Sequence, residues 1–508
     1  MRKASPPALP DEKIAQPLRA LLRSASPETI LRALVDLDAQ VDLAKLGRVL
    51  AQRGATKRQR RELVAAALTR VARRSQAALR FFLDRAQQEG LVRSWRGLVI
   101  VNRLIVEATP AGILALAERP EVVAIAGETE LPVPALAAVP EPAAPERTSW
   151  GVTAVGAPEA WRRGLDGSGV VVGIIDSGAS AVHEQLAAGF RGGGRSWLDP
   201  RGRNAAPEDT WTGHGTGVLS CAVGRNAGGV TVGVAPGAQW IACAGLPEGR
   251  YNNVLATICA EWMLTQGQPD VLVIAWILPT AGCDRSLQPL VDAWRAAEIL
   301  PVFAAGNHGP DIGTDRSPAN YGGLYPGGRS ALSVGGLARG GGLYASSSRG
   351  PSGCGAAVFP FLVAPAEDLP AAFPLSSSTY VQARGTSYAA GLVAGAAALL
   401  LQRHPEASVA ELEDALAGGA ADLGEPGPDG TFGYGRLDVP SALARLDRSR
   451  LTREGRPPRP ASPGGPRGSA GRRRRGTGHG TPARRCRRHG RRSNPHAACG
   501  PSACPACS

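Results

Sequence analysis

Three chemically reactive residues stand at the ends of apolar or small-residue stretches that lie far apart in the chain. Asp176 ends the apolar run GVVVGIID, His214 lies between glycines in TGHGTG, and Ser387 stands at the start of TSYAAGLVAGAAALLL. Each has an ordinary alternative role: the Asp in a turn, the His in packing, and the Ser as a helix N-cap. Together, an acid, an imidazole and an alcohol form the set that nucleophilic acyl transfer uses.

The region around these residues alternates apolar strands with helices of small residues. The strand candidates are VVVGII, QWIACAGL, DVLVIAWIL, LPVFAAG and ALSVGG, and the helix candidates are NNVLATICAEWMLTQ, LQPLVDAWRAA and GTSYAAGLVAGAAALLLQRH. This alternation predicts an α/β fold with a doubly wound, mostly parallel sheet. Reactive groups in such sheets gather beyond the carboxyl ends of the strands, which is where Asp176 stands. The GSG before the first strand is misplaced for a dinucleotide-binding loop, because that loop follows a strand.

The motifs around these residues resemble those of the subtilisin-like serine proteases. DSGASAVHEQL is similar to the aspartate motif of that family, GHGTGV to its histidine motif, and GTSYAAGLVAG to its serine motif. VFAAGNHGP is similar to the segment with the oxyanion-hole asparagine, which places that role on Asn307. The resemblance is strongest to the bacillopeptidase F-like enzymes and covers roughly residues 58–446. It implies a serine endopeptidase that works through an acyl-enzyme.

The resemblance also implies a role for each residue of the site. Ser387 would attack the scissile carbonyl, His214 would accept and return the proton, and Asp176 would orient the imidazole. Asn307 and the backbone N–H of Ser387 would donate to the oxyanion. The competing function is a non-catalytic subtilisin-like scaffold that binds peptides, but such a scaffold has no use for all four of these groups.

The expected substrate-binding residues are Ala275, Trp276 and Ile277 on the pocket strand, and Gly306 before the asparagine. Relatives carry glycine where Ile277 stands, at a position where the substrate backbone usually approaches. A branched side chain there would narrow the cleft, or it would point into the core and leave the cleft unchanged. The sequence leaves both possibilities open.

Composition divides the chain into four regions. Residues 1–130 are predicted as helices followed by a small α+β unit, which resembles the propeptide that assists folding and inhibits the site in this family. Residues 131–147 form a Pro/Ala-rich linker in which we expect self-cleavage, and residues 148–447 form the catalytic domain. Residues 448–508 are expected to be a disordered Arg-rich tail. Within the first region, SPETILRALVDL is predicted as a helix.

The net charge of +14 belongs almost entirely to the tail, since the last 58 residues hold fourteen arginines and one acidic residue. The tail has no aromatic residue for base stacking, so we expect no nucleic-acid partner. The expected partners are a protein or peptide substrate and the intramolecular propeptide, and we expect a monomer. No apolar run reaches transmembrane length. The resemblance suggests an extracellular protein, although no secretory signal is visible, and a cytoplasmic location is the alternative.

No cofactor is expected to be required. Structural calcium occurs in many relatives, but no Asp-rich loop specifies a site here, and the only candidate ligands are Asp311 and Asp315. Cysteines outside the tail stand singly in apolar or small-residue runs, which predicts buried free thiols. These are Cys221, Cys243, Cys259, Cys283 and Cys354.

Overall fold

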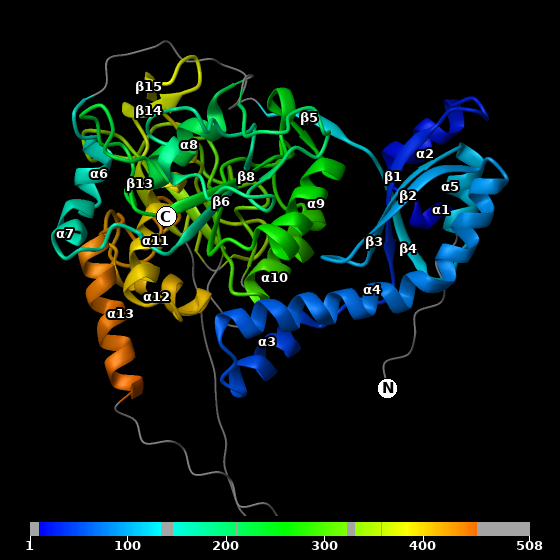
Figure 1. Cartoon of the computed structure of the whole chain (residues 1–508), viewed down its shortest axis with the longest axis horizontal. Coiled ribbons are helices and arrows are strands. Elements are labelled where there is room, and N and C mark those ends of the chain that lie inside the picture. The colour runs from blue at the N-terminus through cyan, green and yellow to red at the C-terminus, as the bar shows by residue number, and fades with distance from the viewer. Residues whose placement is uncertain (1–9, 134–145, 210–211, 323–330, 357, 455–508) are drawn as a thin grey trace, which may run out of the picture. The chain divides into compact units, whose positions relative to one another are not determined.

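The main sheet has seven strands, all paired in parallel, in the order β13-β12-β11-β10-β6-β8-β7 (Figure 1). The structure is a computed structural model that describes residues 10–133, 146–209, 212–322, 331–356 and 358–454. From β6 the chain continues to strands on one side and then crosses to β10 on the other, so the winding reverses beside β6. The strands are β6 (Val171–Asp176), β7 (Trp197–Leu198), β8 (Gln239–Ala244), β10 (Val271–Ile274), β11 (Leu300–Ala304), β12 (Leu332–Leu337) and β13 (Leu362–Pro365).

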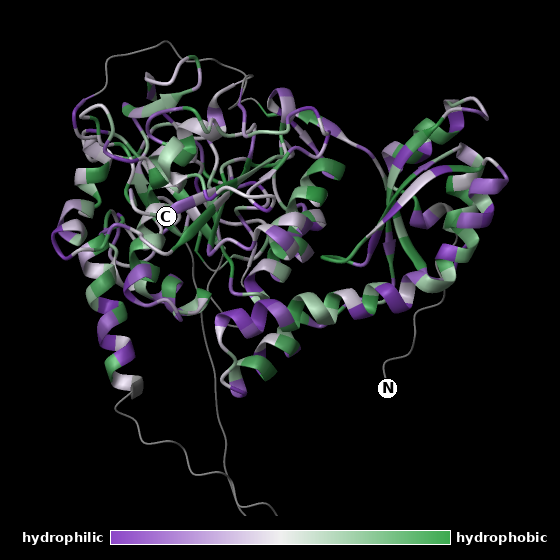
Figure 2. Cartoon of the chain, in the orientation of Figure 1, coloured by the Kyte–Doolittle hydropathy of each residue, from purple (hydrophilic) through white to green (hydrophobic). Residues whose placement is uncertain are grey.

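Helices cover both faces of this sheet. α8 (His214–Val223) and α11 (Thr386–Arg403) pack on one face, and α9 (Asn253–Trp262) and α10 (Gln288–Ala296) pack on the other. Successive residues of a strand point to opposite faces, so Ile174 enters the core under α8 and α11 while Ile175 enters the core under α9 and α10. Figure 2 shows hydrophobic residues along these strands. Burial on both faces explains why the strands are nearly continuous apolar runs.

The predicted α/β class with a doubly wound, mostly parallel sheet is confirmed. The five strand candidates form β6, β8, β10, β11 and β12, and the three helix candidates form α9, α10 and α11. The body also contains the antiparallel pair β14 (Leu369–Phe373) and β15 (Thr379–Ala383) and the helices α6 (Trp150–Ala154), α7 (Ala157–Arg162), α12 (Val409–Gly419) and α13 (Val439–Glu454). Its short 3-10 helices are η2 (Ala187–Gly189), η3 (Pro247–Gly249) and η5 (Arg285–Leu287), and η4 (Met263–Gly267) is a π-helix. α13 continues past the predicted domain boundary at residue 447, and the rest of the predicted tail lies outside the described residues.

The N-terminal region contains a separate antiparallel sheet in the order β2-β3-β1-β4. Its strands are β1 (Leu31–Leu37), β2 (Val92–Leu98), β3 (Arg103–Ala108) and β4 (Val122–Gly127), and its helices are α1 (Pro10–Lys13), α2 (Gln16–Ser24), α3 (Leu43–Gln52), α4 (Lys57–Gln88) and α5 (Pro110–Ala117). The helix predicted over SPETILRALVDL is wrong, because residues 31–37 form β1 between β3 and β4. Ala33, Val35 and Leu37 alternate into the core, so pairing on both edges outweighs local helix propensity. The strand, strand, helix, strand order predicted after it is confirmed.

The N-terminal region contacts the rest of the chain through a short strand pair. β5 (Glu130–Pro132) runs antiparallel to β9 (Arg250–Asn252), and the N–H of Val133 donates to the carbonyl of Gly249 at 3.0 Å. The predicted linker, which starts at residue 131, therefore begins inside a strand. Most of that linker, residues 134–145, lies outside the described residues.

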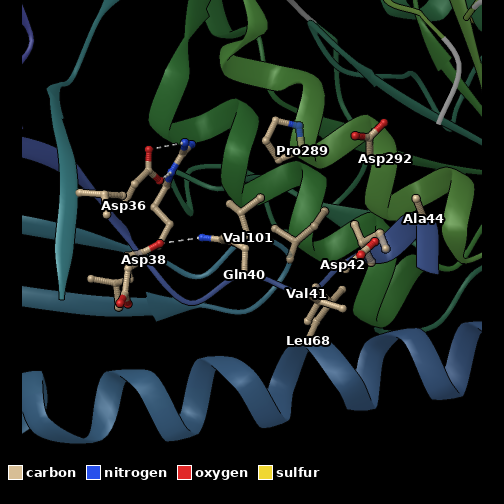
Figure 3. Close-up of a pocket in the computed structure, with 15 residues that line it drawn as sticks. Asp36, Asp38, Gln40, Val41, Asp42, Ala44, Leu68, Val101, Pro289 and Asp292 are labelled. Carbon is tan, nitrogen blue, oxygen red and sulfur yellow. Dashed lines mark hydrogen bonds and ion pairs between the residues drawn. The ribbon is translucent and has the colours of Figure 1, made fainter. Parts of the chain in front are cut away.

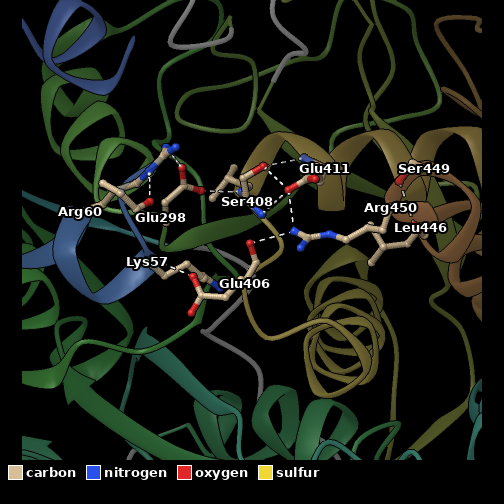
Figure 4. A network of polar contacts seen from close by, with 11 residues as sticks. Lys57, Arg60, Glu298, Glu406, Ser408, Glu411, Leu446, Ser449 and Arg450 are labelled. Atoms are coloured by element: carbon tan, nitrogen blue, oxygen red, sulfur yellow. Dashed lines mark hydrogen bonds and ion pairs between the residues drawn. The ribbon is translucent and has the colours of Figure 1, made fainter. Parts of the chain in front are cut away.

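The N-terminal end of α4 makes a second contact, which is ionic (Figure 4). The polar contacts of this helix end include Arg60 with Glu298, Arg61 with Asp270 at 2.8 Å, and the Lys57 N–H with Glu406 at 3.0 Å. Glu298 is only 6% exposed, and burial raises the pKa of its carboxyl. A buried charge is costly unless it is paired, so Arg60 compensates for the burial of Glu298.

A cavity of about 600 Å³ separates the segment after β1 from α10, and Asp292 lines it (Figure 3). Burial raises the pKa of Asp292 to about 6, although Arg295 and Arg285 act in the opposite direction. The folded chain therefore binds the carboxyl proton of Asp292 more tightly than the unfolded chain does. The contribution of this protonation to the free energy of unfolding is fully present below the ordinary pKa of an aspartate and is lost as the pH rises through about 6.

We expect Asp292→Asn to raise the free energy of unfolding at pH 8 by up to about 3 kcal/mol and to change it little at pH 3.5. The asparagine stays neutral at both pH values, so it avoids the cost of ionising a half-buried group. Urea unfolding of both chains at the two pH values measures the difference. An equal effect at both pH values would contradict a protonation origin.

Two disulfides correct the prediction of free thiols. Cys243 at the end of β8 is bonded to Cys259 on α9, and Cys283 is bonded to Cys354, 71 residues later. Cys221 is a buried free thiol as predicted, and burial raises its pKa to about 12. The bonded pairs are adjacent only in the folded chain, so the spacing in the sequence gave no sign of them. None of the described helices has both the length and the hydropathy that a bilayer crossing needs.

Candidate active site

Asp176 is the last residue of β6, so its carboxylate lies at the carboxyl edge of the main sheet. The side chain is fully buried, and Oδ1 accepts hydrogen bonds from the Ser177 N–H and from His214 Nδ1, both at 2.8 Å. Because an ionised carboxylate only accepts, His214 carries its proton on Nδ1. Nε2 is then left as an acceptor, which is the tautomer that a general base needs.

His214 is the first residue of α8, and the glycines beside it permit a close approach to β6. Gly213 has a φ of +64°, and a Cβ there would lie 2.5 Å from the Phe373 ring. A Cβ on Gly215 would lie 2.1 Å from the carbonyl oxygen of Gly178. A side chain at Gly215 would push α8 away from the end of β6, and one at Gly213 would push it away from Phe373 of β14, so the glycines allow His214 to lie close to the carboxylate.

Asp209 is a buried acid beside this pair that was not predicted from the sequence. Its Oδ2 accepts hydrogen bonds from the N–H and the hydroxyl of Thr216 at 2.9 and 2.7 Å. Burial is the main cause that raises the pKa of its carboxyl, and the charge of Asp176 raises it further. Protonation of Asp209 is therefore easier than that of an exposed aspartate. The only sign in the sequence was an acid five residues before His214, in EDTWTGHG.

Close packing of α8 against α11 brings His214 and Ser387 to the same end of the fold. A Cβ on Gly391 of α11 would lie 2.5 Å from the carbonyl oxygen of Val218 on α8, so the two helices touch through backbone. The ring of Tyr388, which follows Ser387, packs 5.8 Å from the His214 ring between centroids. The small residues of the serine motif therefore serve the approach of the two helices.

The hydroxyl of Ser387 is directed to the pocket strand. It is 3% exposed and donates to the carbonyl of Ala275 at 2.9 Å. Among the hydrogen bonds that the described residues make, none joins Ser387 to His214. Catalytic hydrogen bonds are often long or absent before substrate binds, and rotation about the Cα–Cβ bond redirects the hydroxyl.

Asn307 is held so that its amide nitrogen is available. Its Oδ1 accepts from the N–H and the hydroxyl of Thr386 at 3.0 and 3.1 Å. The Thr386 hydroxyl also accepts from the Gly306 N–H at 3.1 Å. Within the described parts of the chain, Nδ2 of Asn307 has no hydrogen-bond acceptor. Thr386, which was not predicted, thus turns the Asn307 amide so that its donor is left for a ligand.

These groups line one cavity of about 510 Å³. The expected substrate-binding residues Ala275, Trp276, Ile277 and Gly306 all lie in its wall, together with Ser387 and Asn307. The full lining is Val133, Ala275, Trp276, Ile277, Pro279, Ala304, Gly306, Asn307, His308, Arg316, Thr386 and Ser387. The cavity therefore brings together a serine hydroxyl, an amide donor and space for a ligand.

Ile277 forms part of this wall and packs across it. It is 8% exposed, and its Cδ1 would lie 2.7 Å from a Cβ built on Gly306. Ile277 belongs both to the buried core under α9 and α10 and to the cavity wall, so it combines the two positions that the sequence left open. Trp276 is fixed beside it, since its Nε1 donates to the carbonyl of Ile175 at 2.8 Å and its ring packs on Tyr251.

The candidate calcium ligands do not form a site. Asp311 is exposed, whereas Asp315 is buried and accepts hydrogen bonds from Asn320 and from the Gly353 N–H. The described segments contain no group of three or more His, Cys, Asp or Glu residues placed to hold a metal ion. The residues present thus do not fit a carboxylate-rich calcium site.

Comparisons with known proteins agree with this geometry. Residues 167–435 match the Subtilase family. The chain is 28% identical over 480 residues to bacillopeptidase F of Bacillus subtilis, an alignment that covers 85% of this chain and 32% of that protein. It is 31% identical to subtilisin E of Bacillus subtilis, over 56% of this chain and 68% of that protein, and 30% identical to subtilisin Savinase of Lederbergia lenta, over 58% and 97%.

The chain belongs to the Subtilase family, and its enzyme class is that of the subtilisin-like serine proteases. The expected likeness to bacillopeptidase F is confirmed. The chain spans about one third of the length of that relative.

Proposed function

We propose that this chain is a serine endopeptidase in which Ser387, His214 and Asp176 form the catalytic triad. The observation that carries the proposal is the hydrogen bond between the buried Asp176 and Nδ1 of His214, beside a cavity lined by Ser387 and Asn307. A non-catalytic peptide-binding scaffold would not need an imidazole whose tautomer is set in this way.

The reaction begins when Ser387 Oγ leaves the carbonyl of Ala275 and turns to His214 Nε2. Oγ then attacks the substrate carbonyl carbon, and its proton moves to Nε2. Asp176 stabilises the imidazolium that results. The same proton passes to the leaving amine as the peptide bond breaks, which leaves an acyl-enzyme. Water, deprotonated by His214, releases the acyl group.

The oxyanion of the tetrahedral intermediate is bound by Nδ2 of Asn307 and the backbone N–H of Ser387. Asn307 is suited to this role because Thr386 occupies its Oδ1 and turns Nδ2 toward the cavity. A donor fixed in this way needs no reorganisation as charge develops.

We expect Asn307→Leu to lower kcat by about 10²- to 10³-fold with little change in KM, a scale taken from subtilisin itself. Leucine has a similar size but no donor, so the loss should fall on the transition state. Steady-state kinetics with a peptide anilide measures both parameters. A large rise in KM at constant kcat would instead assign Asn307 to ground-state binding.

The N-terminal region is proposed to act as an inhibitory propeptide that is removed by self-cleavage within residues 131–146. β5 pairs with β9, and Val133 lies in the wall of the cavity that holds Ser387. A chain in this position would hinder substrate from reaching the site. The uncut chain is thus proposed to be an inactive precursor.

The proposed enzyme is a monomer that acts on protein or peptide substrates outside the cell and requires no cofactor. The two disulfides support the extracellular location over the cytoplasmic alternative, because such bonds persist in oxidising compartments.

Labelling with a serine-directed phosphonate tests the proposed function. We expect one phosphonyl group per chain, located by mass spectrometry on the peptide that contains Ser387. Chain denatured before the reagent is added is the control, since an isolated serine is not activated. A folded, processed chain that stays unlabelled would support the peptide-binding scaffold.

A further inference from the structure

One arginine faces the cavity that holds Ser387, and no carboxylate neutralises it. Arg316 is half-buried in the cavity wall, and none of the lining residues is acidic. In the described parts of the chain, Arg316 makes no ion pair. The buried Arg295, in contrast, makes two hydrogen bonds to Glu413, at 2.5 and 2.8 Å. Desolvation without a partner lowers the pKa of the Arg316 guanidinium.

The backbone that carries Arg316 is held on both sides. The preceding Asp315 accepts from the Gly353 N–H at 2.8 Å, so its carboxylate is engaged there rather than with Arg316. The following Ser317 accepts at its carbonyl from the Leu278 N–H at 2.7 Å. The Cys283–Cys354 disulfide closes off the same region, since Gly353 and Cys354 are neighbours in the chain. The guanidinium is therefore presented from a fixed main chain.

The other titratable group of the cavity, His308, adds a hydrogen-bonding group but little charge. Its Nδ1 is buried and has no hydrogen-bond partner among the described residues. Burial lowers the pKa of the imidazole, and the charge of Arg316 lowers it further. Near neutral pH the imidazole is neutral, so Arg316 supplies the charge of the cavity.

The position of the cavity indicates which part of a substrate enters it. Ser387 and Asn307 both line it, so the carbonyl under attack lies at its rim. The side chain next to that carbonyl, on the residue before the cleaved bond, is the one that can extend into the space. Ile277 packs across toward Gly306, which favours a slender side chain over an aromatic ring.

We propose that Arg316 makes this endopeptidase selective for substrates with a carboxylate side chain, glutamate or aspartate, on the residue before the cleaved bond. A guanidinium and a carboxylate form paired hydrogen bonds, and a partly desolvated site strengthens them. The inference rests on the proposed function and names its substrate class. Arg316 is a specificity-determining residue in this proposal and takes no part in bond breaking.

The test compares two peptides that differ only in whether one side chain ends in a carboxylate or a carboxamide. Two amidated peptides carry either Glu or the isosteric Gln before the cleaved bond, and kcat/KM is measured for each with the processed wild-type chain. We expect a preference for Glu of about 10- to 100-fold at low salt, falling as ionic strength rises. Arg316→Gln should reduce the preference to less than about 3-fold, and Arg316→Glu should favour a Lys peptide over the Glu peptide. Arg162→Gln, at an exposed position of α7, is the matched control and should keep the wild-type preference.

The possible results separate the specificity from the catalytic proposal. Equal cleavage of the Glu and Gln peptides overturns the acidic specificity and leaves the endopeptidase proposal intact. A chain that cleaves no peptide and takes up no phosphonate overturns both. A second pair of peptides tests whether Arg316 binds the C-terminal carboxylate of a peptide. Both peptides lack acidic side chains, and one ends in a free acid and the other in an amide. A strong preference for the free acid would show that Arg316 recognises the C-terminal carboxylate of a substrate, which also overturns the proposal.

Discussion

Replacing Ser387 with alanine is expected to lower kcat by about 10⁶-fold, the scale that the same replacement has in subtilisin itself. The alanine chain lacks the attacking oxygen, so only the binding and oxyanion contributions remain. The Ser387 hydroxyl is bonded to the carbonyl of Ala275, and its loss leaves that acceptor unpaired in the core. We therefore expect a small loss of stability but an intact fold.

Mass spectrometry of refolded chains provides the readout. Wild-type chain should lose an N-terminal fragment by a cut within residues 131–146, whereas the Ser387→Ala chain should stay whole. Ser378→Ala, an exposed serine in the turn before β15, is the matched control and should process normally. Wild-type chain added in trace amounts distinguishes self-cleavage from cleavage by another molecule. Processing of pure Ser387→Ala chain would contradict the assigned nucleophile.

Replacing Asp176 with asparagine is expected to lower kcat by about 10⁴-fold. An asparagine amide can donate to Nδ1 of His214, which would move the imidazole proton to Nε2. The ring could then no longer accept the proton of Ser387. Because asparagine has the shape of aspartate, the fold and KM should change little.

The two kinetic parameters and the fold are measured together for this variant. Circular dichroism should match that of the wild type, and the fall in kcat/KM should equal the fall in kcat. Reaction with the phosphonate should slow in parallel, since it depends on the same proton transfer. A variant that keeps more than about a tenth of the wild-type rate would show that Asp176 does not orient the base.

The candidate site residues could be named from the sequence because each lies in a short, contiguous motif that resembles one of a known family. The small residues that flank His214 and Ser387 are consecutive in the sequence, although the close approaches that they allow, of α8 to β6 and of α11 to α8, form only in the folded chain. The α/β class followed from apolar runs long enough to fill a sheet buried on both faces. These patterns are readable from a single sequence.

The features that were missed depend on neighbours far away along the chain. β1 resembles a helix locally, and only its pairing with β3 and β4 makes it a strand. Asp209 and Arg316 look like ordinary loop residues, and the fold places Asp209 near Asp176 and Arg316 in the cavity wall. The direction of the Ser387 hydroxyl is a choice of rotamer, which sequence does not encode.

The ionic contact between Arg60 and Glu298 and the pairing of β5 with β9 have a consequence for how the enzyme would be switched on. Each contact joins a residue before the segment 134–146 to a residue after it, so a cut there severs the covalent link between the two parts and leaves both contacts in place. Before the cut, the N-terminal region is present at a high effective concentration near the catalytic domain. After the cut, the fraction of catalytic domain that it occupies depends on the protein concentration. The cleaved N-terminal region would then dissociate more completely in dilute solution, and concentrated protein would remain inhibited for longer.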